Sequence, residues 1–77
     1  MKKTNKSLNK NVADFTYKGR NYEIDLLLDS IIHGFASYDV FDVTEDKQGA
    51  LVVQLFLDNS DYMPSELITL AKEEIEE

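Results

Sequence analysis

Residues 50–57, with the sequence ALVVQLFL, restrict the fold of this chain more than any other segment. Polar, turn-forming stretches bound the segment on both sides (EDKQG before it and DNSD after it), which is typical of a β-strand. Alternate side chains of a strand point to opposite faces. One set here is Leu51, Val53, Leu55 and Leu57, and the other is Ala50, Val52, Gln54 and Phe56. Because both sets are largely apolar, we expect a central strand that helices cover on one side.

Two further segments predict strands. Residues 12–17 place Phe15 and Tyr17 at alternating positions, and residues 38–44 (YDVFDVT) are rich in β-branched and aromatic residues. The stretch KGRN at residues 18–21 predicts a turn, in which Gly19 is able to adopt a positive φ.

Two segments have helical periodicity. In the first, apolar residues recur at the spacing of an amphipathic helix: Ile24, Leu27, Leu28, Ile31, Ile32 and Phe35. In an alternative interpretation, residues 22–24 pair with residues 15–17 as a hairpin. The helix and the hairpin can both form if the second strand of the hairpin is short. A second helix is expected to begin near Pro64. Its apolar stripe would be Leu67, Ile68, Ala71 and Ile75, and its glutamate-rich end, which opposes the helix dipole, should fray.

The predicted element order is therefore β-α-β-β-α. This order favours an α+β fold, with a small antiparallel sheet and two helices on one face, as in a ferredoxin-like plan that lacks its last strand. We expect residues 50–57 in the middle of the sheet, and the edge of the first strand to be open. Residues 1–11 are polar and aperiodic, which predicts a disordered basic arm ahead of a single domain at residues 12–77.

Charge is distributed unevenly along the 77 residues. The first ten contain four lysines and no acid, whereas the rest contain four basic and fifteen acidic residues, a balance of −11. Such a domain repels nucleic acid and anionic lipid, so we expect neither as a direct partner. The chain has no cysteine and no apolar segment suited to a signal peptide or a membrane span, which favours a soluble, cytoplasmic protein.

Residues with catalytic or metal-binding potential are few. His33 is the only histidine, and no nucleophile motif surrounds it. Asp25 and Asp29 would share one face of a helix, but a magnesium or calcium site needs more oxygen ligands. The acids at residues 58–66 lack the spacing and the glycine of a calcium loop. We therefore expect no enzymatic activity, no metal and no cofactor, and a small metal-dependent enzyme built on the aspartates is the least favoured hypothesis.

Two surfaces are candidates for binding a partner. The open edge of the first strand includes Phe15 and Tyr17. The sheet face opposite the helices would present Val52 and Phe56, with Val40 beside them, as an exposed apolar patch. The basic arm or a homodimer mate would be alternative covers for this patch.

The order of these segments resembles a known family. The stretch from Tyr22-Glu23-Ile24-Asp25 to Phe35, then Asp-Val-Phe-Asp-Val, a Val/Leu-rich strand and a short helix are similar to HxsD-type proteins. These are small accessory proteins of the His-Xaa-Ser peptide-maturation systems. The resemblance covers residues 15–75 and implies a helper that binds a peptide or an enzyme and has no catalysis of its own.

The hypothesis that these features favour is a non-catalytic accessory or adaptor module that binds a peptide or protein, with a role in peptide maturation implied by the resemblance. The alternative is an acidic inhibitor that mimics nucleic acid and blocks a basic cleft of an enzyme.

Overall fold

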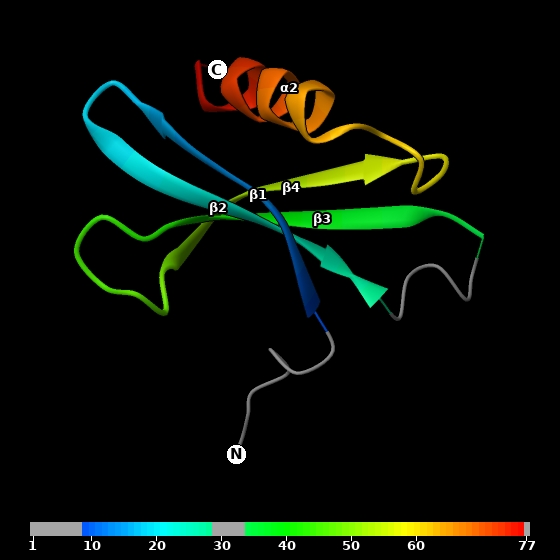
Figure 1. Ribbon diagram of the computed structural model, residues 1–77, viewed down its shortest axis with the longest axis horizontal. Coiled ribbons are helices and arrows are strands. Elements are labelled where there is room, and N and C mark those ends of the chain that lie inside the picture. The colour runs from blue at the N-terminus through cyan, green and yellow to red at the C-terminus, as the bar shows by residue number, and fades with distance from the viewer. Residues whose placement is uncertain (1–8, 29–33, 77) are drawn as a thin grey trace.

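The protein forms an antiparallel sheet with one helix packed across it. The computed structural model describes residues 9–28 and 34–76. Within them lie β1 (Asn9–Tyr17), β2 (Arg20–Leu27), β3 (Ala36–Asp42), β4 (Ala50–Leu57) and α2 (Pro64–Glu76). The strands follow the order β1-β2-β3-β4, and α2 lies over one face of the sheet (Figure 1). The α+β class is confirmed, but the described strands form a simple meander in place of the predicted β-α-β-β-α order.

The segment predicted to begin the first helix is a strand. β2 pairs along its length with β1 on one side and β3 on the other. Ile24 and Leu27 fit a helical spacing, yet Tyr22, Ile24 and Leu26 also alternate, and these three are buried on one side of the strand. A short apolar run fits both the helical period and the strand period. This segment is a strand because it pairs with β1 on one side and with β3 on the other. Residues 29–33 of the predicted helix lie outside the described residues.

The alternative hairpin between residues 15–17 and 22–24 is confirmed. Lys18 and Gly19 form the two-residue connection, with φ of 52° and 80°. Two successive positive φ values are typical of the tight turn that matches the twist of a hairpin, and Gly19 is the residue type that it favours. β1 also begins at Asn9, so the last residues of the predicted 1–11 arm belong to the sheet.

The sheet order overturns the expected position of the most apolar strand. β4 pairs with β3 alone among the described strands and lies at the edge of the sheet, whereas β2 and β3 are central. Its two apolar faces therefore do not indicate burial on both sides.

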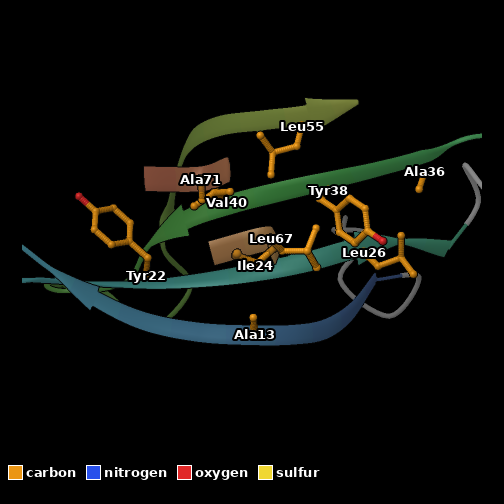
Figure 2. Close-up of a cluster of buried hydrophobic side chains, with 10 residues drawn as sticks. All are labelled: Ala13, Tyr22, Ile24, Leu26, Ala36, Tyr38, Val40, Leu55, Leu67 and Ala71. Atoms are coloured by element: carbon orange, nitrogen blue, oxygen red, sulfur yellow. The ribbon is translucent and has the colours of Figure 1, made fainter. Parts of the chain in front are cut away.

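The core lies between the sheet and α2. Figure 2 shows buried side chains from all four strands together with Leu67 and Ala71 of the helix, which belong to the same cluster. Ile24, Val40 and Leu67 are at most 1% exposed. The predicted helix start at Pro64 and the apolar stripe of α2 are confirmed, since Leu67 and Ala71 are buried and Ile68 and Ile75 pack against the same core.

A β-bulge in β4 changes which side chains share a face. Val53 pairs with Val40, but Leu51 pairs with Phe41, so Val52 is an extra residue between the two pairs. The bulge interrupts the alternation at this point. Leu51 therefore lies on the face opposite α2 and does not share the face of Val53, contrary to the simple alternation expected from the sequence.

Both ends of α2 are held by side chains. At its start, the Met63 amide donates a hydrogen bond to Glu66 Oε1 at 2.8 Å, which caps the first turn. At its end, Glu76 accepts a hydrogen bond from the Tyr17 hydroxyl and pairs with Lys18 Nζ at 2.6 Å. The Lys18 ammonium lowers the pKa of Glu76. The last turn, expected to fray, is thus helical through Glu76 and contacts the tip of the β1–β2 hairpin.

We predict that Leu67→Ala reduces the free energy of unfolding by about 2–4 kcal/mol, because the truncation leaves a cavity under α2. Glu73→Ala on the exposed side of the same helix should change it by less than about 0.5 kcal/mol. Urea denaturation followed by circular dichroism measures both. Equal losses for the two variants would contradict the packing of α2 on the sheet.

Gly49 and Gly19 provide a matched pair, since both have φ of 80°. A Cβ atom at Gly49 would lie 2.9 Å from Phe41 Cβ and 2.9 Å from Val43 Cγ1, whereas one at Gly19 meets nothing within 4 Å. Gly19→Ala should cost about 1 kcal/mol from backbone strain alone. Gly49→Ala should cost at least about 1 kcal/mol more, because overlap is added to the strain. Thermal unfolding of the two variants tests the difference.

Candidate partner-binding surface

The strand β4 is the most exposed apolar part of the sheet. Among the described strands it alone has no charged residue. Its Leu51, Val52 and Phe56 side chains are 51%, 47% and 67% exposed. An uncharged strand at a sheet edge, with apolar side chains in solvent, presents both unpaired backbone groups and apolar area to another chain. We call residues 50–57 the β4 edge.

Cross-strand pairs define the sheet face opposite α2, which we call the far face. Its rows are Leu27, Ser37 and Phe56; then Asp25, Asp39 and Gln54; then Glu23, Phe41 and Leu51. A polar row therefore separates two rows that end on β4 in an apolar side chain. Gln54 Nε2 donates to Asp39 Oδ1 at 3.3 Å within this polar row.

Exposure on the far face increases toward β4. Asp25 and Ser37, on the two central strands, are 6% and 4% exposed, whereas Phe56 is largely exposed. Asn11 Nδ2 donates to Asp25 Oδ1 at 3.2 Å, so this buried carboxylate has a polar partner. The far face is therefore exposed to solvent near β4, whereas Asp25 and Ser37 on its central strands are buried.

The two sheet edges differ in their protection. β1 contains the charged residues Lys10 and Asp14, and a register shift between Asn11 and Ala13 marks a bulge in its pairing with β2. Charges and bulges are features by which natural sheets prevent edge-to-edge pairing. The outer strand β4 has a bulge at Val52, but it has no charge and no proline. Of the two edges, β4 is the better suited to pairing.

The structure separates the five residues that the sequence singled out. Phe15 stacks on Tyr22 with ring centroids 5.0 Å apart, and the Tyr17 hydroxyl is bound to Glu76. Both side chains are partly buried against the core, so the fold itself uses them. Val52 and Phe56 are exposed, as the sequence predicted.

The placement of Val40 beside this patch is wrong. Val40 is fully buried, because it pairs with Ile24 and Val53 on the face that α2 covers. Leu51 takes its place as an exposed apolar neighbour on the far face, and sequence reasoning missed it. The bulge that moves Leu51 leaves no recognisable signal in the sequence.

Charge differs between the two ends of the β4 edge. At the Leu57 end, Asp58 and Asp61 are exposed, and within the described part of the chain neither has a basic partner. The Asp58 carboxylate accepts a hydrogen bond from the Tyr62 hydroxyl at 3.3 Å and raises the pKa of Tyr62.

At the Ala50 end, two of the neighbouring carboxylates share one cationic partner. Arg20 Nε lies 2.6 Å from Asp42 Oδ2, and Arg20 Nη2 lies 3.8 Å from Glu45. The Thr44 hydroxyl and the Arg20 guanidinium both donate to Asp42, and they lower the pKa of Asp42 to about 2. Asp46 beside them is exposed and has no basic partner among the described residues, so the Leu57 end carries more unpaired negative charge than the Ala50 end but not all of it.

Within residues 9–28 and 34–76, no group of three or more His, Asp or Glu side chains is placed to hold a metal ion. His33 and Asp29 lie outside these residues. A shallow depression of about 310 Å³ lies over β1 and β2, lined in part by Thr16, Tyr22 and Glu23. It combines two carboxylates with aromatic, hydroxyl and amide groups.

No family model matches the chain, and no match is found among curated proteins or among solved structures. Over the described residues, none of the helical structure has the length and apolar character that crossing a bilayer requires.

The Asp42 site predicts a dependence of stability on pH. Its folded-state pKa of about 2 lies below the ordinary value of 3.8. The ionised form thus stabilises the fold at pH values above the ordinary pKa, and this stabilisation is lost as the pH falls through about 2. We expect Asp42→Asn to be less stable than the natural protein at pH 7 and nearly equal to it near pH 2. Urea denaturation at several pH values measures this, with Glu74→Gln as a control; a difference that persists at pH 2 would contradict it.

Proposed function

We propose that the protein is a non-catalytic adaptor that binds an extended segment of a partner polypeptide as an added strand at the β4 edge. The observation that carries this proposal is the position of the chain's most apolar and only uncharged described strand at the edge of the sheet. The unpaired backbone groups of an edge strand supply hydrogen bonds to the added strand, and side-chain pockets supply selectivity.

Side chains on β4 support a defined mode of contact. Phe56 is 67% exposed, and covering an aromatic side chain of this size contributes about 1–2 kcal/mol. Leu51 and Val52 add apolar area at the other end of the strand. On the far face Gln54 lies between Phe56 and Leu51, and its amide, which donates one hydrogen bond to Asp39, has a carbonyl oxygen to offer a polar side chain of the partner. A bound strand would thus alternate apolar, polar and apolar contacts on this face.

The resemblance to HxsD-type accessory proteins agrees in kind with this function, since a helper in peptide maturation has to hold a peptide. The alternative function, an acidic inhibitor that mimics nucleic acid, draws support from exposed acids such as Asp46, Asp58 and Glu74. The two functions differ in what holds the partner. An acidic mimic loses affinity steeply with salt, whereas strand addition through apolar contacts retains most of it.

A library of ten-residue peptides displayed on phage tests the proposal. We expect the protein to enrich peptides with alternating apolar residues. Phe56→Asp should weaken the binding of an enriched peptide at least tenfold, because it places a charge in the apolar contact. Thr16→Asp, a change at an exposed position on β1, should leave the affinity unchanged.

Amide hydrogen exchange of the complex provides the second measurement. A peptide added at the β4 edge should slow exchange in residues 50–57 and leave β1 unaffected. Protection of β1, or enrichment that Phe56→Asp does not alter, would refute the proposed site. Both variants should unfold within about 0.5 kcal/mol of the natural protein, because the two side chains are exposed.

A further inference from the structure

The two ends of the β4 edge differ in charge, and this difference indicates which kind of polypeptide segment would bind there. Asp58 follows β4 directly and Asp61 lies three residues further on, and both are exposed. Glu66, in the first turn of α2, adds a third exposed carboxylate beyond the same end. At the opposite end, Arg20 is within 4 Å of both Asp42 and Glu45. A bound strand therefore meets more unbalanced negative charge at the Leu57 end, from these three carboxylates, than at the Ala50 end, where Asp46 is the one described acid without a basic partner.

Resting on the proposed function, we infer that the occupant is an extended segment whose lysine or arginine residues precede its apolar residues. The direction follows from the sheet, in which every neighbouring pair is antiparallel. A strand added antiparallel to β4 places its N-terminal end beside Leu57 and Asp58. Basic residues at that end complement Asp58 and Asp61, whereas basic residues at the C-terminal end would lie beside Arg20.

Pairing with β4 also fixes the spacing of the segment. A residue opposite Phe56 is followed two positions later by one opposite Gln54, because alternate residues share a face. The first of these contacts an aromatic ring and is apolar, and the second contacts an amide and is polar. The occupant is therefore described by basic residues, then an apolar residue, then a polar residue two positions later.

A second copy of the chain is a weaker candidate for the same edge. Lys10 precedes Phe15 and Tyr17 in β1, which superficially fits the pattern. Those two side chains are engaged with Tyr22 and Glu76 in their own fold, and β1 has a bulge that interrupts regular pairing. The net charge of −7 also makes two copies repel each other.

Three synthetic peptides test the inference. All contain the same alternating core of valine and threonine, with two lysines before the core, two lysines after it, or two glutamates before it. We expect the first peptide to bind about fivefold tighter than the second at low salt, and the third to bind most weakly. The preference between the first two should shrink as salt rises, because the charges are exposed. Isothermal titration calorimetry at two salt concentrations measures these affinities.

Matched double variants separate charge at the β4 edge from overall charge. Asp58→Asn with Asp61→Asn should remove the preference for the first peptide over the second. Glu73→Gln with Glu74→Gln, which removes the same charge from the exposed side of α2, should leave that preference intact.

The outcomes distinguish the inference from the function on which it rests. Equal binding of all three peptides, with protection of β4 in hydrogen exchange, would overturn the charge rule and leave strand addition standing. Tighter binding of the second peptide would overturn the stated direction. Failure of every peptide to bind or to protect β4 would count against the proposed function itself. Analytical ultracentrifugation measures whether the protein self-associates as its concentration rises. If it does, and if this association protects β4 from hydrogen exchange, the occupant of the β4 edge is a second copy of the chain and not a peptide.

Discussion

The packing of α2 onto one face of the sheet is the interaction on which the rest of the structure depends. Leu67 and Ala71 close over Ile24 and Val40, and this contact assigns each strand residue to the covered face or to the far face. A chain of this size has few other apolar contacts to replace it. The helix covers one face of the sheet, which leaves β4 with side chains exposed on the far face and an outer edge that pairs with no other described strand.

The sequence allowed part of this arrangement to be predicted. The strand at residues 50–57, the helix beginning at Pro64 and the turn at Gly19 all followed from local signals, since alternation, proline placement and glycine conformation act over a few residues. The candidate residues Val52 and Phe56 were also correctly expected to be exposed. Local chemistry is sufficient for the strand, the helix start and the turn because neighbouring residues decide them.

The incorrect predictions share a different cause. Ile24 and Leu27 fitted a helical period, and only pairing with two other strands makes their segment β2. The edge position of β4 depends on strand order, which an apolar sequence does not specify. Val40 was assigned to the wrong face because its face depends on the register between β3 and β4, which pairs it with Val53, and the sequence does not specify that register. Each of these depends on contacts between distant parts of the chain.

The tie between Tyr17 and Glu76 joins residues 59 positions apart in the chain. During synthesis the four strands leave the ribosome before α2 does. The sheet face that bears Ile24 and Val40 therefore stays exposed to solvent until α2 packs on it. Contacts of such large sequence separation form late and slow the completion of folding. The nascent sheet is consequently most vulnerable to association with other chains in the interval before α2 docks, when apolar surface is exposed on its two faces at once.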